Sequence, residues 1–191
     1  MPSGAVVGTG SLRRRAQLKA VRPDLEVAGI RGNVDTRLRK LDKGQYDAIV
    51  LAAAGLTRLG WEERITQRLA PPLMLPAPGQ GALGIECRED DQRVRAVLSA
   101  LDHPATRQAT TAERAVLAAL HGGCSAPIAA WGRVEGDRLL LDGLVADLEG
   151  ATTIRAHGAG PVGDALAIAS QVAEDLRQQD AEAIIRAARG E

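Results

Sequence analysis

Five arginines lie at or just beyond the ends of three short apolar segments: Arg13, Arg14, Arg31, Arg37 and Arg58. A backbone turn that opens a helix presents free N–H groups and the positive end of the helix dipole to an anion. Arginine adds a planar fork that can bind a carboxylate through two hydrogen bonds. Because five such groups are more than a single phosphate needs, the pattern predicts a site for a ligand with several carboxylates.

Alternating strands and helices must position these arginines. Apolar segments at residues 5–7, 25–30 and 48–51 read as strands, and residues 12–21 and 34–41 read as helices, the first with Ser11 as its N-cap. Such alternation predicts a parallel sheet, whose strands end at one edge where ligands bind. We therefore expect the five arginines to converge on one cleft. Three other arginines fall on other helix faces and should be solvated: Arg15, Arg22 and Arg39.

The two cysteines have different surroundings. Cys124 follows two glycines and precedes a strand pattern, so a bulky group could reach its sulfur, although a small residue filling a turn is an equally good interpretation. His121 could act as its general base, but no Asp or Asn partner is identifiable. Cys87 lies in an apolar segment at residues 82–87 that reads as a strand, and we expect it to be inert.

The remaining pattern predicts a second kind of domain. A proline-rich stretch at residues 71–78 reads as a hinge, and helices are expected at 91–101 and 103–120. Strands at 128–134, 139–146 and 152–157 form an antiparallel meander, covered by helices within 164–188. The predicted fold class is α/β plus α+β: a parallel-sheet domain like a periplasmic binding protein, then a small domain with a three-stranded antiparallel sheet. The expected boundaries are 1–76, a return segment at 77–100, and 101–191.

Composition excludes several classes of function. Net charge is zero, but residues 1–75 carry 13 Lys and Arg against 7 Asp and Glu, whereas residues 76–191 carry 11 against 17. This asymmetry suggests an anionic partner for the first part, and an aromatic content of 2% argues against nucleic acid. No apolar run approaches the roughly 18 residues of a membrane span. We expect no metal and a cytoplasmic protein, because the cysteines lack metal spacing and no signal peptide is visible.

Six motifs together resemble the porphobilinogen deaminases, also called hydroxymethylbilane synthases. In chain order they are VGTGSLRR at 7–14, IRGNVDTRL at 30–38, YDAIVLAAAGL at 46–56, PGQGALGIECR at 78–88, AERA at 112–115 and GGC at 122–124. Each motif alone is weakly specific, but their order covers nearly the whole chain. One small departure is Gly10, where a second serine is common in the family.

The resemblance implies a transferase of heme and tetrapyrrole biosynthesis that joins four porphobilinogen molecules into hydroxymethylbilane and releases ammonia. It implies a dipyrromethane cofactor bound to Cys124 through a thioether, with porphobilinogen and oligopyrrole intermediates as partners, and a monomer when full length. The implied cofactor-binding residues are Ser11, Arg13, Arg14 and Arg37. The implied substrate-binding residues are Arg31, Arg37, Arg58 and Gln80.

The resemblance also implies three domains, of which nearly all of the first would be absent here. That domain supplies the catalytic aspartate in the family, so no catalytic residue is expected in this sequence and the chain should be inactive alone. The alternative from the residues themselves is a non-catalytic binding module for a small polycarboxylate. That alternative explains the arginines but gives Cys124 no role.

Overall fold

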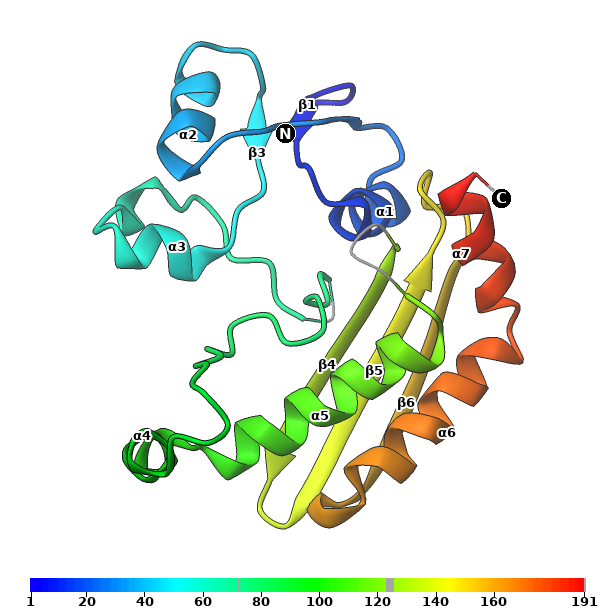
Figure 1. Ribbon diagram of the computed structural model, residues 1–191. Helices are drawn as coiled ribbons and strands as arrows, with labels where there is room; N and C mark the ends of the chain where they lie inside the picture. The colour runs from blue at the N-terminus through cyan, green and yellow to red at the C-terminus, as the bar shows by residue number, and fades with distance from the viewer. Residues whose placement is uncertain (72, 123–125, 191) are drawn as a thin grey trace.

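Two separate three-stranded sheets organise the molecule, as the computed structural model shows for residues 1–71, 73–122 and 126–190 (Figure 1). The first sheet is parallel, with strand order β2-β1-β3, and the second is antiparallel, with order β4-β5-β6. Helices accompany both sheets. The predicted fold class is therefore confirmed.

The parallel sheet is built from very short strands: β1 (Val6–Gly8), β2 (Glu26–Ala28) and β3 (Ala48–Ile49). Its register places Val7 opposite Val27 on one side and Ala48 on the other. Its core is small and centres on Ala5, Val7 and Leu25. The third strand is shorter than the expected residues 48–51, and both of its residues are only half-buried.

The helices beside this sheet begin where their capping residues predict. Helix α1 (Leu12–Val21) has Ser11 as its N-cap, and the Ser11 hydroxyl accepts a hydrogen bond from the Arg14 N–H. Helix α2 (Val34–Asp42) is capped in the same way by Asn33. After β3 the chain continues through α3 (Ala53–Arg58) and the short 3₁₀ helix η1 (Glu62–Arg64).

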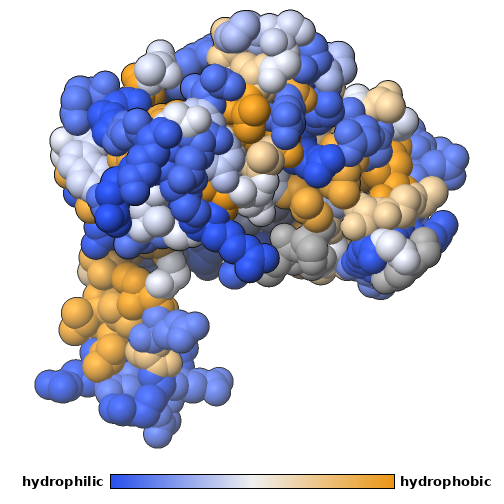
Figure 2. Space-filling view, turned by 90° about the horizontal axis from the view of Figure 1, so that it is seen from above, coloured by the Kyte–Doolittle hydropathy of each residue, from blue (hydrophilic) through white to orange (hydrophobic). Residues whose placement is uncertain are grey.

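The segment that connects the two sheets contains the main departure from the predicted elements. Residues 82–87 form no strand and are largely exposed, with Leu83 at 88% and Ile85 at 57% exposure. An extended apolar segment becomes a strand only where another strand supplies hydrogen bonds, and residues 82–87 pair with no strand of either sheet. The next elements are α4 (Gln92–Leu98) and η2 (Ser99–Leu101). Figure 2 shows hydrophobic side chains reaching the surface, most plainly on a part that projects from the body.

The antiparallel sheet forms the larger hydrophobic core. Strands β4 (Ile128–Glu135), β5 (Arg138–Ala146) and β6 (Thr153–Pro161) pair over their whole lengths. Helices α5 (Pro104–Ala119) and α6 (Ala165–Arg177) cover one face of this sheet (Figure 1). The short 3₁₀ helix η3 (Val162–Asp164) leads into α6, and α7 (Ala181–Arg189) follows α6 and packs beside it. The predicted meander and its covering helices are confirmed.

Helix α1 joins the two halves by packing against the uncovered face of the antiparallel sheet. Ala16 of α1 and Leu75 share a buried cluster with Ala129 and Leu144. Arg15 forms an ion pair with Glu149, which lies in the turn between β5 and β6. The two sheets therefore share an interface whose centre is apolar and whose edge is charged.

Candidate functional site

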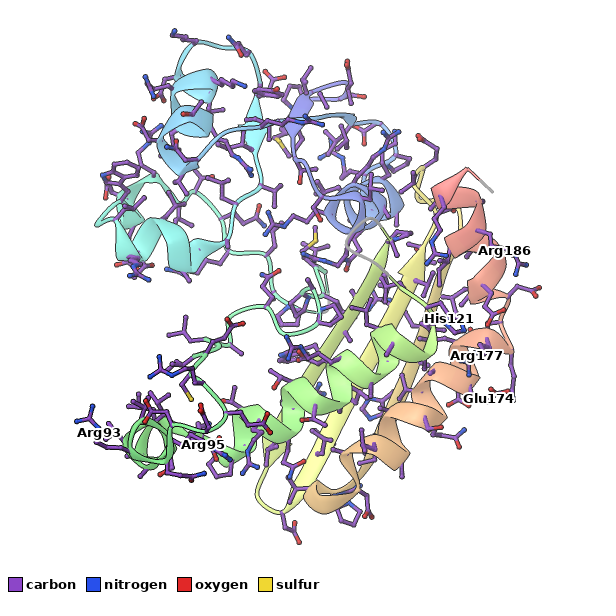
Figure 3. The ribbon with its side chains drawn as sticks, viewed as in Figure 1. Arg93, Arg95, His121, Glu174, Arg177 and Arg186 are labelled. Atoms are coloured by element: carbon purple, nitrogen blue, oxygen red, sulfur yellow. The ribbon has the colours of Figure 1, made fainter. Side chains whose placement is uncertain are left out.

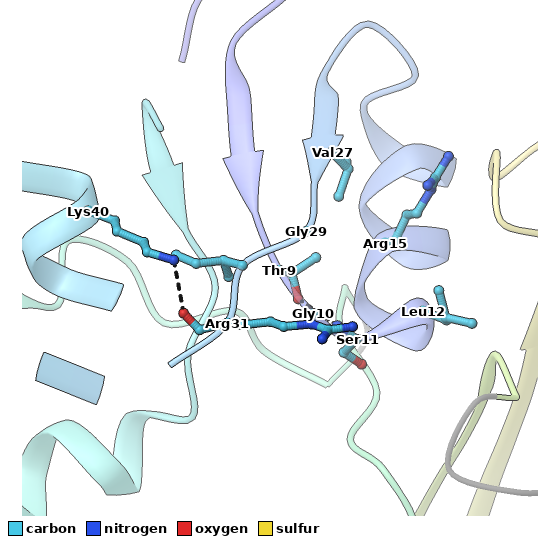
Figure 4. Close-up of a pocket in the computed structure, with 10 residues that line it drawn as sticks. Thr9, Gly10, Ser11, Leu12, Arg15, Val27, Gly29, Arg31 and Lys40 are labelled. Carbon is cyan, nitrogen blue, oxygen red and sulfur yellow. Dashed lines mark hydrogen bonds between the residues drawn. The ribbon is translucent and has the colours of Figure 1, made fainter. Parts of the chain in front are cut away.

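A cavity of about 460 Å³ lies where the parallel strands end (Figure 4). Its walls are the turn of Thr9, Gly10 and Ser11, the loop at residues 29–31, and one side of α1 and α2. The volume falls in the roughly 300–1,000 Å³ range of small-molecule sites. The Cβ of a serine in place of Gly10 would lie 3.0 Å from the Ile30 carbonyl oxygen, so the glycine lets the turn and the loop approach closely.

Of the three cations of the cavity wall, the sequence predicted one. Arg31 lines the cavity, as expected, together with Arg15 and Lys40, which we did not expect there. Lys40 donates a hydrogen bond to the Arg31 carbonyl oxygen over 3.1 Å, and Figure 4 shows this contact. Arg15 stands one helical turn after Leu12 and shares its cavity-facing side, although its side chain is still 36% exposed, as expected for a solvated arginine.

Arg13 lies behind the turn rather than in the cavity. Its side chain is on the inward face of α1 and only 7% of the residue is exposed. The guanidinium donates to the Leu75 carbonyl oxygen over 2.6 Å and to Gln80 Oε1 over 3.0 Å. Burial, with a contribution from the charge of Arg14, lowers the pKa of Arg13 to about 10.

The other predicted arginines, Arg14, Arg37 and Arg58, do not line this cavity. Arg14 donates to the Val50 carbonyl oxygen, and burial, followed by the charge of Arg37, lowers its pKa. Arg37 donates to the Gly32 carbonyl oxygen over 2.7 Å. Arg58 is exposed and does not line the cavity. Successive helix positions point about 100° apart, so Arg13 and Arg14 face different sides of α1, while Arg37 of α2 lies close enough for its charge to affect the pKa of Arg14.

The predicted arginines share one electrostatic property. In the part of the chain that the structure describes, none of the five pairs with a carboxylate, and the guanidiniums of Arg13, Arg14 and Arg37 donate to carbonyl or amide oxygens instead. The three arginines that we expected to be solvated do form ion pairs: Arg15 with Glu149, Arg22 with Asp24, and Arg39 with Asp35. Burying a guanidinium without a counter-charge is unfavourable, so the positive charge around the turn is available to an anionic ligand.

The two cysteines cannot be compared directly. Cys124 lies outside the described residues. Cys87 is exposed and belongs to no strand, so the strand on which we based its expected inertness is not formed. Among the described residues, no group of three His, Cys, Asp or Glu side chains could hold a metal ion. The same residues contain no helix that is long and apolar enough to cross a membrane.

Glu113 is a functional candidate that sequence reasoning gave no role. It lies on α5 and is 5% exposed. Its carboxylate accepts hydrogen bonds from the N–H groups of Gly79 and Gly132, at 2.6 Å and 2.7 Å. The AERA motif contains this residue, and a charged residue on the apolar face of a helix was the available signal.

Fold and site together define a two-sheet protein with a cation-lined cavity and, behind its turn, arginines that pair with no carboxylate among the described residues. Residues 1–96 match the family model described as porphobilinogen deaminase, dipyromethane cofactor binding domain. Residues 107–178 match the model described as porphobilinogen deaminase, C-terminal domain. The chain belongs to the porphobilinogen deaminase family, whose members are transferases of porphyrin and heme biosynthesis.

Proposed function

We propose that this chain holds carboxylate-bearing pyrroles for the condensation of four porphobilinogen molecules into hydroxymethylbilane with release of ammonia. The observation that carries the proposal is the set of buried or half-buried guanidiniums without a carboxylate partner among the described residues, above all Arg13 and Arg14. Each porphobilinogen ring bears an acetate and a propionate, so a growing pyrrole chain brings two negative charges per ring to this positive region.

The residues present fit a dipyrromethane group by the chemistry of their donors. Ser11, Arg31 and Lys40 offer a hydroxyl and two cations at the cavity wall. Arg13 and Arg14 add positive charge behind the turn, where low solvent exposure strengthens its effect. We propose Cys124 as the thioether anchor of this group, which when bound supplies the pyrrole position at which the chain grows.

Binding of the pyrroles and proton transfer to them are separate tasks that need different residues. Of the described residues that line the cavity, none is an Asp or a Glu. Proton transfer to and from the reacting pyrrole needs a positioned acid or base, which binding alone does not replace. We therefore propose that the 191-residue chain binds pyrroles but does not turn porphobilinogen over by itself.

Intact-mass measurement with a pyrrole-specific colour test examines the anchor. The expected result is a covalent dipyrrole on the protein that is absent from Cys124→Ser, while Cys87→Ser retains it. An unmodified Cys124 in protein that makes hydroxymethylbilane would contradict the proposal. Ammonia release from porphobilinogen by the isolated chain would contradict its proposed inactivity and leave the binding role intact.

A further inference from the structure

The segment between the two sheets is held from both sides. On one side, Gln17 of α1 accepts from the Leu75 N–H over 2.7 Å and donates to the Leu75 carbonyl oxygen over 3.1 Å. On the other side, the Ala130 N–H of β4 donates to the Pro76 carbonyl oxygen over 3.2 Å. Residues 75–80, which we call the crossing segment, therefore touch the anion-binding half and the C-terminal half at once.

Glu113 bridges the crossing segment to the antiparallel sheet a few residues further on. One carboxylate oxygen accepts from Gly79 in the crossing segment, and the other accepts from Gly132 in β4. At Pro76 the crossing segment bonds directly to the backbone of β4, whereas at Gly79 the Glu113 side chain makes the connection. Gly132 lies so close to α5 that an added Cβ would be 2.8 Å from the Ala109 carbonyl oxygen, which fixes the distance that the Glu113 side chain has to span.

Both hydrogen-bond acceptors of Arg13 belong to the crossing segment. They are the Leu75 carbonyl oxygen and Gln80 Oε1, and Gln80 directly follows the residue that Glu113 holds. Gln80 is exposed, and its Oε1 also accepts a hydrogen bond from the Ala77 N–H within the crossing segment over 3.3 Å. The place of the Arg13 guanidinium behind the turn therefore depends on where the crossing segment is held.

A carboxylate suits this bridge better than its amide counterpart does. Two backbone N–H donors face the Glu113 side chain, and only an ionised carboxylate has two oxygens that both accept without donating. A glutamine would turn its NH₂ group toward one of these donors. Burial raises the pKa of Glu113, while the two backbone hydrogen bonds act in the opposite direction.

We infer that Glu113 is a positioning residue, which pins the crossing segment to the C-terminal sheet and so keeps Arg13 in place behind the anion-binding turn. This inference rests on the proposed function, because it concerns how that function's binding site is assembled. In this inference the C-terminal domain does more than stabilise the fold. Through Glu113 it also fixes the position of the Arg13 guanidinium, which belongs to the other half of the molecule.

Calorimetric titration of the 191-residue chain with porphobilinogen tests the inference through a double-mutant cycle. Glu113→Gln is expected to weaken binding about tenfold in the wild-type background and less than about twofold in an Arg13→Met background. Glu174→Gln, which changes an exposed carboxylate on α6, should leave the affinity unchanged. An equal loss in both backgrounds, or no loss in either, would overturn the inference.

A second variant covers the case in which Glu113→Gln does not fold. Gln80→Ala removes the side-chain acceptor of Arg13 at an exposed position, and it should weaken binding several-fold only while Arg13 is present. If Gln80→Ala binds as tightly as the wild type, the inferred chain of contacts is wrong. If the wild-type chain itself does not bind porphobilinogen, the proposed function fails, and the inference that rests on it fails as well.

Discussion

The strands of the parallel sheet have two or three residues each, whereas those of the antiparallel sheet have eight or nine. The hydrophobic cores differ in the same direction, since the C-terminal core draws on one sheet and three helices. Arginines differ as well. On α6 and α7, Arg177 and Arg186 pair with nearby glutamates at the surface (Figure 3), while Arg13 is buried without one among the described residues.

This difference separates stability from binding. Surface ion pairs contribute little to folding, so the C-terminal half is held by its apolar core. In the parallel-sheet half, a buried unneutralised guanidinium opposes folding and favours binding of an anion. In the proposed function the two halves therefore differ in role: one supplies the rigid support, and the other carries a charge that the carboxylates of the ligand neutralise. Substitutions in each half should accordingly affect different measured quantities.

The largest effect is expected in the C-terminal core. Leu141 is fully buried on β5, and Leu141→Ala should lower the free energy of unfolding by about 3 kcal/mol, through lost apolar burial and a cavity. Chemical denaturation followed by circular dichroism measures this loss. The folded variant should bind porphobilinogen as the wild type does. A loss of stability below about 1 kcal/mol would contradict the assignment of stability to this core.

Arg13→Met should show the opposite combination. Removing the buried guanidinium should weaken porphobilinogen binding about thirtyfold, roughly 2 kcal/mol, because a positive charge behind the turn is lost from surroundings that screen it weakly. Stability should stay the same or rise, because a buried charge without a counter-charge is removed. Titration calorimetry and denaturation measure the two quantities. Arg39→Met, at an exposed ion-paired position, is the control and should change neither by much.

Gly150→Ala tests the interface between the two halves. Gly150 has φ of +73°, and an added Cβ would lie 2.1 Å from the backbone nitrogen of Ala20 in α1. Either the β5–β6 turn or α1 must move, at a cost of about 1–3 kcal/mol for the backbone strain alone. Thermal unfolding should show the loss, and porphobilinogen binding should weaken because α1 carries the anion-binding turn. Gly136→Ala is a matched control, since it has similar φ but open space around it.

The lowered pKa of Arg13 predicts a pH dependence of stability. A base whose pKa is lower in the folded state disfavours folding while it is charged, so stability rises as the pH passes upward through about 10. Denaturation of wild type and Arg13→Met between about pH 8 and about pH 10.5 isolates this contribution as a difference. The stability advantage of Arg13→Met should shrink as the pH rises; an advantage that stays constant would count against burial as the cause.

The smallest effect is expected at the surface of α7. Arg186 and Glu182 approach within 3.9 Å, and both side chains are about half exposed. Arg186→Ala should change the free energy of unfolding by no more than about 0.5 kcal/mol, with porphobilinogen affinity unchanged. A change in the free energy of unfolding above about 1 kcal/mol would contradict the expectation that the surface arginines contribute little to stability.

The sequence by itself determined the elements whose signals are local. Ser11 and Asn33 mark the starts of α1 and α2 because a capping side chain acts within its own turn. The three-stranded meander follows from alternation and turn residues. The placement of arginines at strand ends also gave the right region for the cavity, since parallel strands end at one edge.

Only the tertiary structure decided which charges face the cavity and which are buried. Arg15 lines the cavity and pairs with Glu149, while Arg13 lies behind the turn and donates to the Leu75 carbonyl oxygen. Both partners are distant in sequence, so local patterns do not reveal them. Residues 82–87 have a strand-like pattern, yet they form none because a strand needs a neighbour to bond with. Glu113 shows the same limit, since its two partners are backbone N–H groups that no residue pattern reveals. Local propensity is encoded in neighbouring residues, whereas long-range hydrogen bonds and burial exist only once the chain has folded.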